Sequence, residues 1–260
     1  MNMSSAGRRW LTAYSMLAYV FLYLPIIVLV AFSFNTSRLN VNWEGFTFAW
    51  YGKLLQNDKI MDAVKNSFTV AAVSTPASTI LGTMAAFAVH RLRFKGRRAI
   101  EGGMYVPIVL PEIIMGISLL SLFTALGFKL GLGTVIIAHI TFSMPFVFVT
   151  VRARLHDLTD TLERAAMDLG ADEWLTFWWV TFPLVAPGIL AGALLAFTLS
   201  LDDVIITFFA AGPGSTTLPL QIFSMVRFGV SPEINALSTI FLVVTLAMVV
   251  TAEWLRRRST

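Results

Sequence analysis

The sequence predicts an all-α integral membrane protein that crosses a bilayer about six times as a helical bundle. Of its 260 residues, 57% are hydrophobic and only 13% are charged, about half the charged share of a typical soluble domain. A water-soluble fold of this length could not bury so much apolar surface, so lipid must solvate much of it. Apolar runs long enough to span a bilayer, roughly 20 residues, recur along the chain.

Six apolar segments are predicted spans, and each contains proline or glycine, which spanning helices tolerate when their neighbours satisfy the freed backbone groups. The first follows Arg8 and Arg9, as a signal peptide would, but it is about twice as long as a typical signal-peptide apolar region. We predict that it is retained, with cleavage as the alternative. Ser231 and Pro232 predict a sharp start of the last helix. The predicted spans are residues 11–34, 67–89, 104–126, 132–151, 184–211 and 232–254, within a single transmembrane domain over residues 1–260.

Basic residues are concentrated in alternate connections between the predicted spans. Because Lys and Arg accumulate on the cytoplasmic side, this pattern predicts that both termini are cytoplasmic, in agreement with an even number of spans. It also accounts for the net charge of +4 without a nucleic-acid partner. On the opposite side, the aromatic loop 35–66 is predicted to pack on the membrane interface, and residues 212–230 are predicted to contain a short surface helix. The cytoplasmic cations are Arg8, Arg9, Arg91, Arg93, Lys95, Arg97, Arg98, Arg152, Arg154, Arg164, Arg256, Arg257 and Arg258.

The connection between the fourth and fifth spans, residues 152–183, is several times longer than the roughly 2–8 residues that most bundle connections need. Its pattern predicts a short amphipathic helix, a break at Gly170 and an aromatic segment. One interpretation is an anchor that lies on the membrane. The other is a docking surface for a soluble partner, because Ala165 and Ala166 allow close approach and the helix carries acids where an anchor would carry Lys and Arg.

This connection also resembles the EAA loop of the permease subunits of ABC importers. Residues 163–170 read Glu-Arg-Ala-Ala-Met-Asp-Leu-Gly, and Val-Thr-Phe-Pro follows nine residues later at 180–183. The two alanines, the glycine and the proline match the family spacing, whereas Arg164 stands where the family has glutamate and Glu163 is one place earlier. The resemblance implies that an ATPase subunit docks here. The implied coupling residues are Glu163, Arg164, Ala165, Ala166, Asp168, Gly170 and Pro183.

The resemblance extends along the whole chain to the C-type permeases of spermidine/putrescine importers, through residues 23–27, 33–35, 139–142, 145–147, 200–204, 222–226 and 229–236. It implies a type I ABC importer permease in the bacterial inner membrane. The implied partners are a second, related permease subunit, two copies of an ATP-binding subunit and a periplasmic solute-binding protein. The chain contains no G-x-x-x-x-G-K-[ST] phosphate loop, so ATP and Mg²⁺ would be bound by the ATPase partner, and we predict that the chain is not an enzyme and holds no cofactor.

Away from their ends, the predicted spans contain three acids, namely Glu112, Asp202 and Asp203. A charge inside the bilayer costs at least roughly 2.5–3.5 kcal/mol, so such residues usually face a cavity or a partner. One hypothesis is an anionic substrate pathway for a polycation. The alternative is a structural role at a helix break. Because helix neighbours point about 100° apart, at most one of the two aspartates is expected to face a pathway.

His139 is expected to be a packing or hydrogen-bonding residue rather than a proton relay and is assigned no functional role, and no metal site is predicted. Three other functions compete with a polyamine importer permease. A permease for another small solute would share the EAA loop, and an ion-coupled secondary transporter would usually show internal repeats, which we do not find. A membrane-embedded enzyme would need a catalytic cluster, which is also not found.

Overall fold

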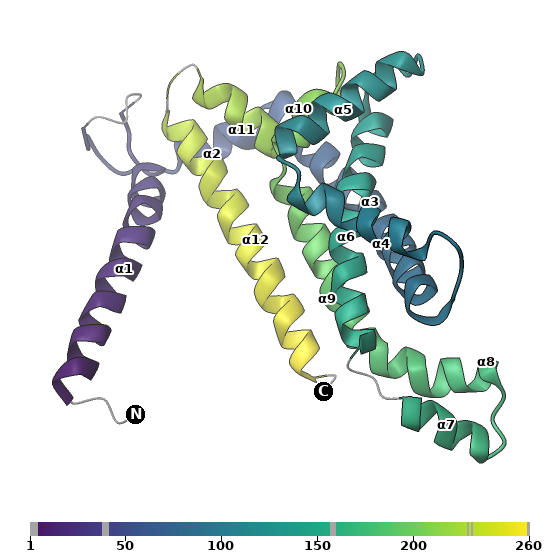
Figure 1. Ribbon diagram of the computed structural model, residues 1–260. Coiled ribbons are helices and arrows are strands. Elements are labelled where there is room, and N and C mark those ends of the chain that lie inside the picture. Colours follow the sequence, from purple (N-terminus) through teal and green to yellow (C-terminus); the bar gives the residue numbers. More distant parts are fainter. Residues whose placement is uncertain (1–4, 38–41, 157–159, 228, 230, 259–260) are drawn as a thin grey trace. The chain divides into compact units, whose positions relative to one another are not determined.

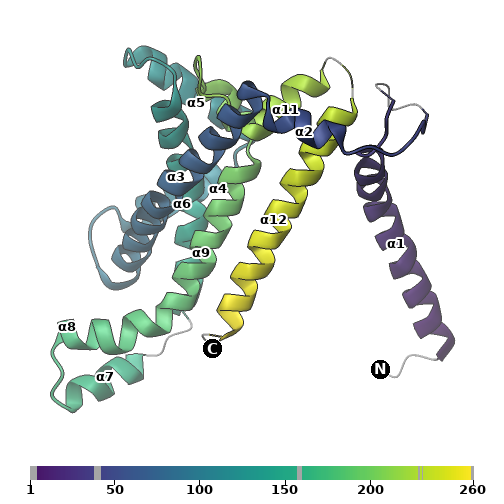
Figure 2. The ribbon, with the colours of Figure 1, turned by 180° about the vertical axis from the view of Figure 1, so that it is seen from behind.

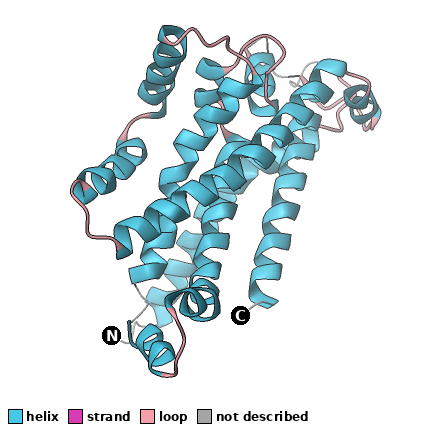
Figure 3. Cartoon of the chain, turned by 90° about the vertical axis from the view of Figure 1, so that its right-hand side faces the viewer, coloured by secondary structure: helices cyan, strands magenta, loops and turns pink. Residues whose placement is uncertain are grey.

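The computed structural model describes residues 5–37, 42–156, 160–227, 229 and 231–258. These residues form helices, with one isolated β-bridge between Asn35 and Phe46 (Figure 3). The predicted all-α class is therefore confirmed. The chain divides into two compact units, which are described separately. The first comprises Met1–Asp58 and Ile222–Glu253, and the second comprises Lys59–Gln221 with Trp254–Thr260.

Among the described residues, four helices are long and apolar enough to cross a membrane, and they overlap the first, second, fourth and fifth predicted spans. Helix α1 runs over Ser5–Phe32, α3 over Asp58–Arg91 and α6 over Leu132–His156. The fourth combines α8 (Glu173–Thr176), a π-helical turn η1 (Phe177–Thr181) and α9 (Phe182–Asp202). The last helix, α12 (Pro232–Arg258), has a shorter apolar stretch over Pro232–Ala247 within the described residues.

The predicted continuity of the span 104–126 is wrong. Helix α4 (Arg97–Val109) and helix α5 (Glu112–Ala125) meet at an angle of 114°. Leu110 and Pro111 have extended backbone conformations, with ψ of 137° and 135°. The proline ring disfavours the helical conformation in the residue before it, and here the chain takes the extended alternative.

The predicted continuity of the span 184–211 is also wrong. Helix α9 ends at Asp202, Asp203 is extended, with φ −64° and ψ 130°, and a new helix α10 begins over Ile205–Ala210. The Asp203 carboxylate accepts hydrogen bonds from the backbone N–H groups of Ile206 and Thr207. A short polar side chain that bonds to the following backbone competes with continuation of the helix, which explains the break.

In the first unit, the loop after α1 is held together by its own aromatic residues. The rings of Phe34, Phe46, Phe48 and Tyr51 pack with centroids 5.1–6.2 Å apart. The indole N–H of Trp50 donates to the backbone carbonyl of Asn35 at 2.7 Å. Helix α2 (Ala49–Leu55) carries Trp50 and Tyr51. The described part of this loop is therefore structured, and its predicted place on the membrane interface stays a prediction.

Two further sequence predictions are confirmed. The segment 212–230 contains a short helix, α11, over Leu218–Val226. Helix α12 begins at Pro232, and the Ser231 hydroxyl accepts a hydrogen bond from the Ile234 N–H at 3.4 Å. Serine therefore satisfies one of the N–H groups that the first turn of the helix leaves unpaired.

Helix α6 lies at the centre of the second unit and runs beside α9 in both views of the chain (Figures 1 and 2). One buried cluster joins α3, α5, α6 and α10 through residues such as Val70, Phe123 and Ile206. The other joins α3, α6 and α9 through residues such as Val89, Phe148 and Val185. A face of small residues on α9 packs on α6: a Cβ on Gly188 would lie 2.8 Å from Arg154 Cβ, and one on Gly192 would lie 3.2 Å from Val147 Cγ1.

Gly82→Ala is expected to destabilise the second unit. A Cβ at this position of α3 would lie 2.8 Å from both the backbone oxygen of Met144 and the Cβ of Val147 in α6. Forced overpacking of this kind costs roughly 1–3 kcal/mol. We expect a lower thermal midpoint for the detergent-solubilised protein, measured by size-exclusion chromatography after heating. Gly103→Ala is the control, because a Cβ there meets no atom within 4 Å, and an unchanged midpoint for both variants would contradict this packing.

Candidate functional site

The connection between α6 and α9 folds as a helical hairpin. Helix α7 (Asp160–Asp168) is followed by Gly170, whose φ of +94° is a conformation that glycine adopts without strain. The Gly170 and Ala171 N–H groups bond back to the carbonyls of Met167 and Ala166, which closes the end of the helix. The Asp172 carboxylate then accepts the N–H of Leu175 at 2.7 Å and caps α8. The predicted helix and its end at Gly170 are confirmed.

The hairpin exposes small and apolar side chains on α7. Ala165 is exposed, and Leu169 has 91% of its surface exposed. Arg164, Asp168 and Gly170 are also exposed, whereas Ala166 and Glu163 are half-buried. Pro183 is the second residue of α9, directly after the π-helical turn η1. Of the predicted coupling residues, Glu163 therefore faces the rest of the second unit, and most of the others face outward.

Glu163 ties the hairpin to the end of α3. Its carboxylate forms an ion pair with Arg91 and accepts the Thr181 hydroxyl at 2.5 Å. The Arg91 guanidinium also donates to Thr181 Oγ1 at 3.1 Å. Three elements, α3, α7 and η1, thus meet at one charge-assisted cluster, which we call the Arg91 cluster (Arg91, Glu163 and Thr181). Hydrogen bonds to charged groups of this kind are roughly twice as strong as neutral ones.

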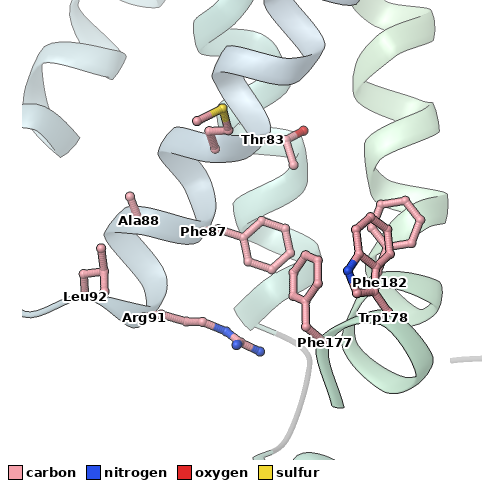
Figure 4. A pocket seen from close by; sticks show the side chains of 9 residues that line it. Thr83, Phe87, Ala88, Arg91, Leu92, Phe177, Trp178 and Phe182 are labelled. Atoms are coloured by element: carbon pink, nitrogen blue, oxygen red, sulfur yellow. The ribbon is translucent and has the colours of Figure 1, made fainter. Parts of the chain in front are cut away.

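Aromatic rings surround the Arg91 guanidinium. Its central carbon lies 6.0 Å from the ring centre of Phe87 and 5.9 Å from that of Phe177, within the range of cation–π attraction. Figure 4 shows Arg91 extending from the end of α3 toward Phe177, below Phe87. A groove of about 460 Å³ lies beside it, lined by Thr83, Met84, Phe87, Ala88, Arg91, Leu92, Phe177, Trp178 and Phe182.

The three membrane acids lie at the two helix breaks of the second unit. Glu112 is the first residue of α5, directly after the break at Pro111, and Asp202 is the last residue of α9. Glu112 lies within electrostatic range of both aspartates. Helices α5 and α10 pack on each other, which brings the two breaks together. Glu112 therefore lies near two aspartates that follow it by 90 residues or more in the sequence. We call Glu112, Asp202 and Asp203 the acid cluster.

The two aspartates have different surroundings. Asp202 is exposed, whereas only 7% of the Asp203 surface is exposed. Asp203 accepts bonds from the N–H groups of Ile206 and Thr207 and from the Thr207 hydroxyl, at 3.1, 2.7 and 2.7 Å. His139 Nε2 lies 3.4 Å from its carboxylate. Among the described residues, no group of three or more histidine, aspartate or glutamate side chains is arranged to hold a metal ion.

Residues 78–259, which include both clusters' α7–α10 members, match a known protein family. Its description is "binding-protein-dependent transport system inner membrane component". The chain belongs to this family. The matched residues include the hairpin and the acid cluster.

The similarity to individual family members covers nearly the whole chain. The chain is 45% identical over 242 residues to the spermidine/putrescine transport system permease protein PotC of Escherichia coli (strain K12), covering 93% of this chain and 92% of PotC. It is 45% identical over 248 residues to the putrescine transport system permease protein PotI of the same strain, covering 93% and 88%. The PotC protein of Haemophilus influenzae is 41% identical over 247 residues, covering 95% of this chain and 96% of that protein.

Solved structures of ABC transporters share the fold. A chain of a bacterial ABC transporter that imports the acidic polysaccharide alginate aligns with a TM-score of 0.74 and 18% identity, covering 97% of this chain and 96% of that chain. A chain of an amino acid ABC transporter with histidines aligns with a TM-score of 0.63 and 13% identity, covering 82% and 100%. The fold is therefore that of ABC importer permeases.

Sequence reasoning missed several members of these clusters in this permease. It treated Arg91 only as a topological charge, and it expected His139 to pack or to form hydrogen bonds without identifying its partners. The partners of each lie far away in the sequence, since Glu163 is 72 residues after Arg91 and Thr207 is 68 residues after His139. One available signal was that His139 is the lone histidine in a predicted span of a chain with acids in other spans.

Proposed function

We propose that this chain is the transmembrane permease subunit of an ATP-driven polyamine importer in the bacterial inner membrane. In this proposal, six spans form a single transmembrane permease domain with both termini in the cytoplasm, the bent pair α4–α5 counts as one span and α12 is the sixth. The chain would form the translocation pathway with a second, related permease subunit. Two copies of an ATP-binding subunit would bind ATP and Mg²⁺, and a periplasmic solute-binding protein would deliver the substrate.

The observation that carries the coupling role is the Arg91 cluster. The hairpin exposes Ala165 and Leu169, as a surface that docks into an ATPase would. On its other side, Glu163 connects it to α3 through Arg91 and to η1 through Thr181. A push or pull on α7 would therefore reach two membrane helices, and rigid-body movement of helices is a known class of switching transition.

The acid cluster supports a cationic substrate. Helix N-termini are positive and C-termini are negative, each by roughly half a charge. Glu112 and Asp203 lie at the N-termini of α5 and α10, where they are complemented. Asp202 lies at the C-terminus of α9, where its charge adds to the helix dipole, and it has no salt bridge within the described part of the chain. Of the three acids, Asp202 is therefore the one best placed to attract an ammonium group.

Helix α9 places the two sites at its opposite ends. The hairpin enters the helix at Phe182, and the acid cluster lies at Asp202 (Figure 1). At 1.5 Å per residue, these ends are about 30 Å apart, close to the thickness of the hydrocarbon core. One continuous helix thus links the proposed ATPase surface to the proposed substrate pathway.

The test has two parts. A strain that lacks this chain should lose uptake of labelled putrescine or spermidine and regain it on complementation. The affinity-purified chain should carry a soluble ATPase subunit. Rescue of another solute alone would favour an ABC permease of different specificity, and an intact transporter without an ATPase would favour an ion-coupled transporter.

Ala165→Trp is expected to remove most of the ATPase subunit from the purified assembly, because a bulky ring would prevent close approach at an exposed position of α7. The measurement is the ratio of ATPase to this chain after affinity purification. Ala99→Trp is the matched control, because Ala99 is exposed on α4 and does not belong to the hairpin. Equal ATPase content in the two variants would contradict docking at α7.

A further inference from the structure

A buried polar network crosses four helices next to the α9–α10 break. Ser74 of α3 lies 3.2 Å from the hydroxyl of Ser200 in α9. That hydroxyl lies 2.8 Å from Nδ1 of His139 in α6, and His139 Nε2 lies 2.9 Å from the Thr207 hydroxyl in α10. The side chains of these four residues and of Asp203 are all buried. Together they form the His139 network.

The donors of this network can be assigned one after another. The Thr207 hydroxyl donates its only hydrogen to Asp203, so its contact with His139 requires a donor on the imidazole, at Nε2. In the neutral ring, Nδ1 is then an acceptor, and it receives the Ser200 hydroxyl. Ser200 Oγ is left to accept from Ser74. Every hydroxyl of the His139 network therefore donates in the same direction, toward the Asp203 carboxylate. Hydrogen bonds that follow one another in this way polarise and strengthen each other.

We propose that His139 is a positioning residue that fixes the α9–α10 break and thereby the direction of the Asp202 carboxylate. His139 is the one member that reaches both sides of the break, through Ser200 before it and Thr207 after it. Asp202 lies between these two anchors and points outward, whereas Asp203 points into the network. The transport consequence rests on the proposed role of Asp202 in attracting the substrate. The positioning itself does not.

A cysteine label tests the positioning without any substrate. The chain contains no cysteine, so Asp202→Cys introduces a single reactive thiol. In the purified assembly, the labelling rate of this chain by a cationic methanethiosulfonate reagent is followed by mass spectrometry. His139→Leu is expected to change the rate at least about fivefold, because it removes both bonds that span the break. His139→Gln is expected to keep the rate within about twofold, because an amide offers a donor and an acceptor.

Thr207→Val and Thr207→Ser provide a second test if His139→Leu fails to assemble. Valine keeps the shape but removes the hydroxyl that links His139 to Asp203, so it should change the labelling rate as leucine at 139 does. Serine keeps the hydroxyl and should not. Unchanged labelling in His139→Leu or, where that variant does not assemble, in Thr207→Val would overturn the proposal. So would an equal change in His139→Gln, because a role in filling space alone makes leucine and glutamine equivalent.

Transport kinetics separate this inference from the proposed function. With Asp202 unchanged, His139→Leu should raise the KM for putrescine uptake about tenfold, with a smaller change in the maximal uptake rate. In an Asp202→Asn background, the same substitution should add little to KM, because both changes act through one carboxylate. If Asp202→Asn leaves KM unchanged, the proposed function fails at this site while the labelling result still decides the role of His139. If Asp202→Asn raises KM and His139→Leu does not, the positioning proposal fails alone.

Discussion

Replacing Arg91 with alanine is expected to reduce substrate uptake at least about tenfold while the ATPase subunit remains bound and continues to hydrolyse ATP. Arg91 holds both Glu163 and Thr181, and it does not lie on the exposed face of α7. Charge-assisted hydrogen bonds contribute roughly 1.5–3 kcal/mol, which corresponds to a tenfold or larger shift in the population of the docked hairpin. The measurement is the ratio of transported substrate to hydrolysed ATP in proteoliposomes that contain the whole assembly.

The neighbouring cation provides a control for loss of positive charge. Arg93 is exposed in the connection after α3, and Arg93→Ala removes the same charge without disturbing the Arg91 cluster. It should leave the transport ratio within about twofold. The double change Arg91→Glu with Glu163→Arg should recover part of the coupling, because it restores an ion pair across the same elements. A normal transport ratio in Arg91→Ala would show that the hairpin passes its movement to the bundle by another route.

The limits of the sequence prediction are clearest at the prolines. Four prolines lie inside continuous helices, namely Pro25, Pro76, Pro145 and Pro187. Pro111, in contrast, lies at the break where α4 and α5 meet at an angle of 114°. Apolar length and proline content do not distinguish these cases. What decides is whether neighbouring groups compensate for the freed backbone, and that information lies in the tertiary packing. Helix existence was therefore predictable, and helix continuity was not.

The candidate site divides in the same way. The hairpin and its end at Gly170 follow from local turn chemistry, because glycine at positive φ ends a helix wherever the chain lies. The direction of Glu163 depends on Arg91, and the roles of Asp202 and Asp203 depend on the break between α9 and α10. A helical wheel drawn over 184–211 places both aspartates on one continuous helix. In the structure they belong to the end of one helix and the start of the next.

Asp202→Asn is expected to reduce putrescine uptake at least about tenfold at concentrations below KM, with normal amounts of assembled permease. Asparagine keeps the size of the side chain but removes the negative charge that adds to the dipole of α9. A charge-assisted hydrogen bond to an ammonium group contributes roughly 1.5–3 kcal/mol, and each 1.4 kcal/mol is tenfold in affinity. The measurement is initial uptake rate against substrate concentration in cells, normalised to the membrane content of this chain.

Asp203→Asn is the matched comparison because it removes the same charge one residue away. Asp203 accepts three hydrogen bonds from α10 through both of its oxygens, and an amide has only one oxygen, so either the Ile206 N–H or the two Thr207 donors would face an NH2 group. Its effect should therefore appear as lower assembly and a lower thermal midpoint of the purified complex. Asp202→Asn should leave both unchanged, since its carboxylate has no such partners within the described residues. If the two variants exchange these phenotypes, the substrate faces Asp203, and the outward direction of Asp202 has no part in transport.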